Sequence, residues 1–246
     1  MTALAAQDID PLTAHAALLE SKYAGADAAE LMRGMIVDEF ARRIALVSSF
    51  GTESAVLLHM AAQIDPTVDV VFVDTGKLFG ETRRYRDRLV ERLGLSGVRT
   101  VRPLERSLNE HDPKGDLWSR NPDLCCFHRK VEPLQRALKN SDAWISGRKR
   151  FQAMSRRGLG RIEVTDGRLK VNPLADWSKE DLDAYFERHD LPRHPLEADG
   201  FLSIGCLPCT QPVEPGEDAR AGRWRGIDKT ECGIHMSADG PVRTPA

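Results

Sequence analysis

The five cysteines of this 246-residue chain form two close pairs and one isolated residue. Cys125 and Cys126 are adjacent, and Cys206 and Cys209 form a C-x-x-C pair much later in the chain, whereas Cys232 stands alone near the C-terminus. Paired cysteines at such spacings bind zinc, bind an iron–sulfur cluster or act as a redox dithiol. A disulfide framework is not expected, because the cysteine number is odd and residues 1–11 do not read as an export signal.

The adjacent pair bears on which metal group these thiols hold. Neighbouring side chains on a helix diverge by about 100°, so Cys125 and Cys126 converge poorly on one small ion. A four-iron cube offers each thiolate its own iron, which suits a diverging pair. The spacing therefore favours a [4Fe–4S] cluster held by both pairs. Zinc is the main alternative, and buried structural cysteines are disfavoured by Pro208 within the second pair.

The isolated cysteine is the candidate nucleophile. The thiolate, and not the thiol, attacks electrophiles, and cations near a cysteine favour the thiolate. Gly233 leaves space beside Cys232, and His235 is the nearest candidate for proton transfer, with a plain contact as the alternative.

The elements that must position these residues alternate between apolar runs and amphipathic segments, which is typical of a parallel sheet covered by helices on both faces. Polar residues that follow such strands gather at the carboxyl edge of the sheet, where ligands bind. We expect helices at residues 13–42, 53–64 and 79–93, and strands at residues 44–50, 68–74, 98–101 and 143–146.

The pattern changes after residue 150. Residues 162–171 predict a hairpin with an Asp166-Gly167 turn, and residues 178–189 predict a helix with Ser178 as its N-cap. From residue 191 proline and glycine are frequent and periodicity is weak. We therefore expect an N-terminal helical segment over 1–40, a nucleotide-binding α/β domain over 41–205, and a mobile C-terminal tail over 206–246 without its own core.

The loop after the first strand is a candidate anion site. Small hydroxyl residues and a glycine there let backbone N–H groups and a helix N-terminus face an anion. It lacks the ending of a Walker A loop, and a simple helix N-cap by Thr52 or Ser54 is the alternative interpretation. The candidate residues are Ser48, Ser49, Gly51, Thr52, Glu53 and Ser54.

Basic residues follow a second strand at the same predicted edge. Guanidinium groups bind phosphate and sulfate oxygens through forked hydrogen bonds, so the arginines there are candidate anion ligands. A solvated basic loop is the alternative, and we favour it for Lys149. The cluster comprises Arg148, Lys149, Arg150, Gln152, Arg156 and Arg157, and the tail adds Arg220 and Arg223.

Composition excludes several classes of protein. A formal net charge of −2 gives no bulk attraction to nucleic acid or anionic lipid, and aromatic residues are scarce near the basic cluster. A membrane-spanning helix needs a run of about eighteen or more apolar residues, and this sequence contains none. We therefore expect a cytoplasmic protein with neither a nucleic-acid nor a membrane partner, and the sequence leaves a homo-oligomer open.

The motifs together resemble a known family. Residues 47–56 are similar to the pyrophosphate loop of the adenine-nucleotide α-hydrolases, a Rossmann-like fold. With the cysteine pairs, with Gly147-Arg148-Lys149-Arg150-Phe151-Gln152 and with Glu231-Cys232-Gly233-Ile234-His235, the chain resembles the iron–sulfur adenylyl-sulfate reductases. The resemblance implies a [4Fe–4S] cluster on the four paired cysteines. It also implies Lys130 as a cation between cluster and substrate, instead of a solvated helix residue, and substrate contacts from Arg148, Gln152, one of Arg156 and Arg157, Arg220 and Arg223.

The implied activity is reduction of adenosine 5′-phosphosulfate to sulfite and AMP. We expect Cys232 to take the sulfo group as an S-sulfocysteine, and thioredoxin or glutaredoxin to release sulfite, with the cluster structural and electrostatic. The nearest alternative is a reductase of the 3′-phosphorylated nucleotide, or one that accepts both. An adenylating or pyrophosphatase-type enzyme and a zinc-bound regulatory module are alternatives of other classes.

Overall fold

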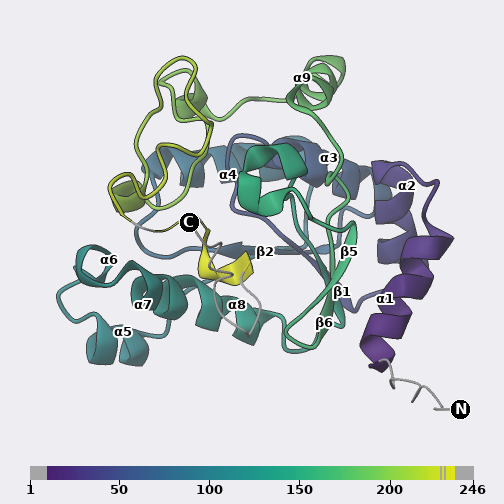
Figure 1. Cartoon of the computed structure of the whole chain (residues 1–246), viewed down its shortest axis with the longest axis horizontal. Coiled ribbons are helices and arrows are strands. Elements are labelled where there is room, and N and C mark those ends of the chain that lie inside the picture. The colour runs from purple at the N-terminus through teal and green to yellow at the C-terminus, as the bar shows by residue number, and fades with distance from the viewer. Residues whose placement is uncertain (1–9, 228, 230, 236–246) are drawn as a thin grey trace, which may run out of the picture.

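A six-stranded sheet forms the centre of the computed structural model, which describes residues 10–227, 229 and 231–235 (Figure 1). The strand order is β3-β2-β1-β4-β6-β5, and every neighbouring pair is parallel except β5 and β6. The predicted parallel, helix-covered sheet is confirmed. The strands are β1 (Ile44–Val47), β2 (Asp69–Val73), β3 (Val98–Val101), β4 (Ala143–Ile145), β5 (Ile162–Thr165) and β6 (Arg168–Val171).

Alternate residues of the strands supply two apolar layers. In β1, Ile44 and Leu46 face a large core with α3 (Ser54–Ile64), α4 (Gly80–Leu93) and α9 (Lys179–Arg188). Ala45 faces the opposite side, where it packs with residues of α8 (Glu132–Ala137) and its end. Since successive strand residues point to opposite faces, one continuous apolar run serves both layers.

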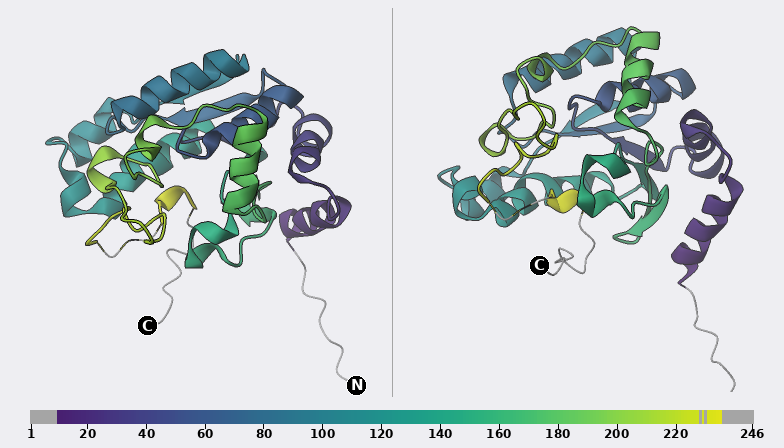
Figure 2. Two further views of the ribbon diagram at one scale, coloured as in Figure 1. Left: turned by 90° about the horizontal axis from the view of Figure 1, so that it is seen from above. Right: turned by 45° about the horizontal axis from the view of Figure 1, so that its top comes forward.

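The N-terminal segment is not the single helix that we expected over residues 13–42. It consists of α1 (Pro11–Lys22), α2 (Ala28–Arg33) and a π-helix η1 (Gly34–Glu39). The break has a local cause: Asp27 accepts from Glu30 N, and the Glu30 carboxylate accepts from Asp27 N, so this capping box begins a new helix. These helices lie at the end of the molecule opposite the loops of residues 191–227 (Figure 2).

The later elements agree with the sequence. β5 and β6 form the predicted hairpin, in which Asp166 and Gly167 have φ values of 50° and 69°. Two consecutive residues with positive φ are what a type I′ turn requires. Ser178 caps α9 and forms a capping box with Asp181, as its position predicted.

Short helices and loops complete the chain. No helix among the described residues has the length and apolarity needed to cross a bilayer. These short elements are α5 (Glu105–His111), α6 (Leu117–Arg120), α7 (Pro122–Cys126), η2 (Phe127–Val131), η3 (Arg150–Gln152), η4 (Met154–Arg156), η5 (Pro195–Glu197), η6 (Leu207–Cys209) and η7 (Gly233–His235).

The strand order creates a switch point between β1 and β4. From β1 the chain proceeds to β2 and β3 on one side, and it then returns to place β4 on the other side of β1. Loops that leave two such strands diverge, and the crevice between them is where open α/β sheets bind ligands. The loops after β1 and β4 are those with the candidate anion and arginine residues.

The N-terminal helices should contribute directly to stability. Leu31 is 1% exposed and belongs to the main core, whereas Leu18 is 66% exposed. Leu31→Ala leaves a cavity and should lower the free energy of unfolding by about 2–5 kcal/mol. Leu18→Ala should change it by less than about 0.5 kcal/mol. Urea unfolding followed by circular dichroism measures both, and equal effects would contradict this role of α2.

Candidate active site

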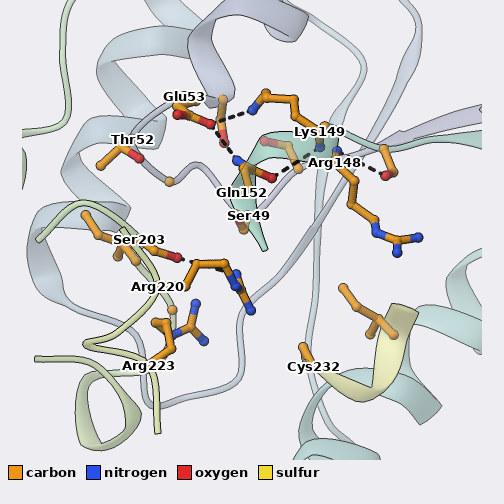
Figure 3. Close-up of a pocket in the computed structure, with 18 of the residues that line it drawn as sticks. Ser49, Thr52, Glu53, Arg148, Lys149, Gln152, Ser203, Arg220, Arg223 and Cys232 are labelled. Atoms are coloured by element: carbon orange, nitrogen blue, oxygen red, sulfur yellow. Dashed lines mark hydrogen bonds and ion pairs between the residues drawn. The ribbon is translucent and has the colours of Figure 1, made fainter. Parts of the chain in front are cut away.

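A cavity of about 220 Å³ lies outside the carboxyl ends of β1 and β4. Most of its lining comes from three parts of the chain: the loop after β1, the loop after β4, and residues from the C-terminal region beyond 200 (Figure 3). Its floor includes apolar side chains of the strands, among them Leu46 and Val73, and its rim is polar and basic. An apolar floor beside several cations suits a ligand with a flat base and an anionic group.

The loop after β1 is fixed by its backbone. Phe50 has a φ of 49°, is fully buried and packs edge-on against Phe72 at 5.2 Å. The Ser48 hydroxyl accepts from Phe50 N at 3.1 Å. This buried aromatic anchor holds the loop in a conformation that non-glycine residues rarely adopt, which is typical of binding sites.

The N-terminus of α3 faces this loop without a side-chain cap from the described residues. Thr52 donates instead to the Leu202 carbonyl at 3.1 Å, so it ties the loop to the C-terminal region. The alternative interpretation of this loop, a simple N-cap by Thr52 or Ser54, is therefore wrong. An uncapped helix N-terminus carries partial positive charge toward the cavity.

Lys149 is not the solvated lysine that we favoured. It is 2% exposed, and its ammonium donates to Glu53 Oε2 at 2.5 Å. Gln152 Nε2 donates to the same carboxylate oxygen at 2.6 Å (Figure 3). Burial lowers the pKa of Lys149 and the Glu53 charge opposes that shift. The Glu53–Lys149–Gln152 triad joins the loop after β1 to the loop after β4. Little in the sequence indicated a buried Lys149, because the lysine stands in a run of basic residues and such runs are usually solvated.

Arg148, Arg220 and Arg223 border the cavity, and Arg148 lies 3.4 Å from the Glu163 carboxylate. Burial lowers the pKa of Arg148, and it lowers the pKa of Arg220 to about 10, which leaves both charged at neutral pH. Nε of Arg148 and Nε of Arg223 are buried and have no hydrogen-bond partner among the residues that the structure describes. Buried cations with unused donors are stabilised by an added anion, so this rim is suited to a phosphate or sulfate group.

Arg156 has a different set of partners. Its Nε and Nη2 donate to the two carboxylate oxygens of Glu231 at 2.5 and 2.8 Å, and its Nη1 donates to Gln152 Oε1 at 2.5 Å. Arg220 Nη2 also donates to Glu231, at 3.3 Å. Burial alone would raise the pKa of Glu231, but the hydrogen bonds from Arg156 and the charge of Arg220 outweigh it and lower the pKa. Sequence reasoning did not find Glu231 as a site residue.

Cys232 lies at the cavity beside the cysteine helix. It is 8% exposed and packs with Cys126 and Trp224. A hydrogen bond from the protonated Cys126 thiol lowers the pKa of Cys232, and the charges of Lys130 and Arg223 act in the same direction, against the effect of burial. The two cations also favour the Cys232 thiolate when Cys126 is itself a thiolate, and the thiolate is the nucleophilic form of cysteine.

Lys130 lines both this cavity and a second, smaller one. Burial would lower the pKa of its ammonium, but the nearby Cys206, Cys232 and Cys126 outweigh burial and raise it. Lys130 therefore lies between the cysteines and the larger cavity, and its role as a cation that bridges cluster and substrate stays a prediction. Arg223 and Trp224 also line both cavities, so these three side chains form the shared wall.

The four paired cysteines all line the second cavity. All five cysteines of the chain have free thiols. Among the described residues, no three His, Cys, Asp or Glu side chains converge on the position of one metal ion. Burial, followed by the nearness of Cys206, raises the pKa of Cys125 to about 11, so a bound cation is needed to favour the thiolates. Four thiols from two distant segments, next to Lys130, fit a cluster in donor type and number.

Two sets of contacts bring these segments together. Arg129 donates twice to Asp112 Oδ2, at 2.9 and 2.6 Å, and once to the Thr75 carbonyl at 2.8 Å. The buried ion pair fastens the helix of Cys125 and Cys126 to the end of α5, and the bond to Thr75 fastens it to the loop after β2. On the other side Leu207 N donates to the Lys77 carbonyl at 2.8 Å, which places the C-x-x-C turn against the same loop.

Comparison with known proteins agrees with this arrangement. Residues 43–212 match the model of the phosphoadenosine phosphosulfate reductase domain, which is more than half of the chain. The chain belongs to this reductase family. An adenosine 5′-phosphosulfate reductase of Mesorhizobium japonicum is 50% identical over 228 residues, which are 93% of this chain and 90% of that protein.

Two further relatives extend the comparison. A phosphoadenosine 5′-phosphosulfate reductase of Gloeobacter violaceus is 43% identical over 80% of this chain and 83% of its own length. The crystal structure of a phosphoadenylyl-sulfate reductase from Candida auris superposes with a TM-score of 0.68 at 27% identity, over 83% of this chain and 99% of that chain. The reductase fold is therefore established for this chain, and the relatives include both nucleotide preferences.

Most of the predicted site residues of this reductase lie together. Arg157 is exposed and does not line the cavity, so Arg156 is the member of that pair that reaches the site. His235 ends η7, but its side chain lies outside what the structure describes. The predicted site residues that line the cavity are Ser48, Ser49, Gly51, Thr52, Glu53, Ser54, Lys130, Arg148, Gln152, Arg156, Arg220, Arg223 and Cys232.

The pair of Lys149 and Glu53 should stabilise the reductase. Lys149→Met leaves the largely buried Glu53 carboxylate without its cation and should lower the free energy of unfolding by about 2–4 kcal/mol. Lys179 makes an ion pair of the same 2.5 Å length with Asp183, but both side chains are more than one-third exposed. Lys179→Met should therefore cost less than about 1 kcal/mol. Urea unfolding measures both variants, and similar losses would contradict the structural role of Lys149.

Proposed function

We propose that this chain is an adenylyl-sulfate reductase that converts adenosine 5′-phosphosulfate to sulfite and AMP. The observation that carries the proposal is the position of Cys232, a buried thiol at the rim of a cavity bordered by arginines and Lys130. The 50% identity to a reductase of that name supports the same substrate. The proposed setting is the cytoplasm, where free thiols persist.

The nucleotide is proposed to bind with its base over the apolar floor and its phosphosulfate among the cations. Residues Ser48 to Ser54 and the uncapped end of α3 are suited to the phosphate. Arg148, Arg220 and Arg223 are suited to the phosphate and sulfate oxygens, because they are partly buried cations, and Nε of Arg148 and of Arg223 is buried without a hydrogen-bond partner among the described residues. Lys130, on the wall toward the cysteines, offsets the remaining negative charge.

In the first step the Cys232 thiolate attacks the sulfate sulfur. A sulfur–sulfur bond forms, the bond from that sulfur to the bridging oxygen breaks, and AMP leaves with the oxygen and the electron pair. The product is a Cys232 S-sulfonate. The arginines hold the oxyanions in line with the attacking thiolate, which contributes orientation and charge stabilisation.

In the second step an external dithiol such as thioredoxin or glutaredoxin resolves the adduct. Its thiolate attacks Cys232 Sγ and releases sulfite, so a mixed disulfide forms. Its second thiol then attacks that disulfide, which leaves an oxidised partner and a reduced Cys232. The dithiol supplies both electrons. The other four cysteines of this chain are assigned to the cluster, so the resolving thiol comes from outside.

We assign a [4Fe–4S] cluster to Cys125, Cys126, Cys206 and Cys209, because these four free thiols line one cavity beside Lys130. When bound, the group holds the two cysteine segments together and gives Lys130 a partner of opposite charge. Both proposed steps are two-electron thiol chemistry, and neither needs electron transfer from the cluster.

The second candidate function is a reductase that prefers the 3′-phosphorylated nucleotide. The relative from Gloeobacter violaceus, 43% identical, carries that name. Comparing kcat/KM for the two nucleotides distinguishes the alternatives.

The nucleophile can be tested by mass spectrometry. Anaerobic protein mixed with adenosine 5′-phosphosulfate, without a reductant, should gain the mass of one SO3 group on the peptide that contains Cys232. Cys232→Ser should gain none and should form no sulfite, since a hydroxyl of ordinary pKa is a far weaker nucleophile. An adduct that persists on the variant would move the nucleophile to another residue.

The cluster can be tested by iron and acid-labile sulfide analysis of anaerobic protein. About four of each per chain are expected for a cube, whereas a zinc site would contain neither. During turnover the oxidation state of the cluster should stay constant in electron paramagnetic resonance spectra. Reduction and reoxidation at the catalytic rate would overturn the thiol mechanism, and iron-free protein with full activity would overturn the cluster assignment.

A further inference from the structure

Glu231, the residue before Cys232, is held to the α/β domain by a buried ion pair in which Arg156 makes two parallel hydrogen bonds. Arg156 and Glu231 have side chains that are 6% and 14% exposed, and two hydrogen bonds join them. Ser155 Oγ approaches the same carboxylate at 3.4 Å. A forked, charge-assisted contact fixes direction as well as distance. Since it is shielded from water, salt screens it weakly.

The anchor continues beyond this pair. Arg156 Nη1 donates to Gln152 Oε1, and Gln152 Nε2 donates to Glu53. Glu53 is the N-cap residue of α3. A line of hydrogen bonds therefore runs from the segment that carries Cys232 to the loop that follows β1. Each member is at most partly exposed, and such networks hold one geometry when all members are satisfied.

We propose that Glu231 is a positioning residue, which holds Cys232 at the cavity through its fork with Arg156. This inference rests on the proposed function, in which Cys232 is the nucleophile. Adjacent Cα atoms are about 3.8 Å apart, so a fixed Glu231 side chain leaves Cys232 little freedom to leave the rim. On this proposal Arg156 binds Glu231 and holds the C-terminal segment in place. Arg148, Arg220 and Arg223 remain the candidate ligands of the substrate.

The rival interpretation makes Arg156 a ligand of the phosphosulfate. It predicts that Arg156 variants lose affinity for the nucleotide and that Glu231 variants do not. The positioning role predicts instead that variants of either residue share one defect. They should expose Cys232 and slow its sulfonation, with nucleotide affinity almost unchanged.

Alkylation of Cys232 tests the anchor without requiring activity. Anaerobically purified protein, free of nucleotide, is treated with iodoacetamide, and the rate of modification of the Cys232 peptide is followed by mass spectrometry. Glu231→Gln and Arg156→Gln should each react at least about tenfold faster than the parent protein. Tenfold corresponds to about 1.4 kcal/mol in the opening equilibrium.

The Arg156→Gln variant distinguishes release of the segment that carries Cys232 from a change in the reactivity of the Cys232 thiol. Removing a cation near a thiol raises the pKa of the thiol, which by itself slows alkylation. Faster alkylation of this variant therefore reports release of the segment. An unchanged or slower rate would overturn the proposal. Arg156→Lys keeps the charge but lacks the fork, and it should also react faster if Arg156→Gln fails to fold.

Two controls restrict the result to this contact. Glu217 pairs with Arg225 at 2.7 Å in the same C-terminal region, but neither residue lines the cavity. Glu217→Gln should react like the parent. Arg225→Gln, which removes the other partner of that ion pair, should also react like the parent. If these two variants react as fast as Glu231→Gln, the effect is not specific to the pair of Arg156 and Glu231.

Nucleotide binding separates this inference from the proposed function. In a Cys232→Ser background, adding Arg156→Gln should change the Kd of adenosine 5′-phosphosulfate, measured by equilibrium dialysis, by less than about twofold. In the Cys232 protein the same change should lower kcat more than it raises KM, and Glu231→Gln should match it. A large loss of affinity in Arg156→Gln alone would support the rival interpretation. A parent that binds no nucleotide would refute the proposed substrate, while the alkylation rates would still decide the role of Glu231.

Discussion

Positive charge that is buried beside a cavity is the constraint on which the rest of the site depends. Arg148, Arg220 and Lys130 are all taken partly out of water, and desolvated cations need negative partners. The chain supplies some of these partners itself. Glu231 faces Arg156 and Arg220, and the cysteines face Lys130. Nε of Arg148 and Nε of Arg223 have no hydrogen-bond partner among the described residues, so an anion that binds there would stabilise the fold.

The sheet provides the geometry for this arrangement. Loops diverge where the strand order reverses between β1 and β4, and they leave a crevice that the C-terminal region covers. The Glu53–Lys149–Gln152 triad joins the two loops, and Thr52 joins the first of them to Leu202. Three chain segments that are far apart in sequence thus form one rim through side-chain contacts, and not through secondary structure.

The sequence predicted the parts of this structure that depend on local patterns. The apolar strand runs, the Asp166-Gly167 turn and the capping box of α9 were all correct, because each is decided within a few residues. The N-terminal segment was predicted as one helix from its Ala- and Leu-rich composition and the apolar period of residues 31–40, whereas the capping box at Asp27 begins a new helix. Lys149 and Glu231 were misjudged or missed for a different reason. Their partners lie 96 and 75 residues away, and sequence spacing does not reveal such pairs.

The position of the C-x-x-C pair has a consequence for biosynthesis. Cys206 and Cys209 come late in the chain, and the C-x-x-C turn lies against the loop that follows β2, beside the helix of Cys125 and Cys126. A cofactor that requires all four thiols can be completed only after nearly the whole polypeptide has left the ribosome. Chains that stop before residue 206 would contain all six strands of the sheet but only two of the four thiols proposed to hold the cluster.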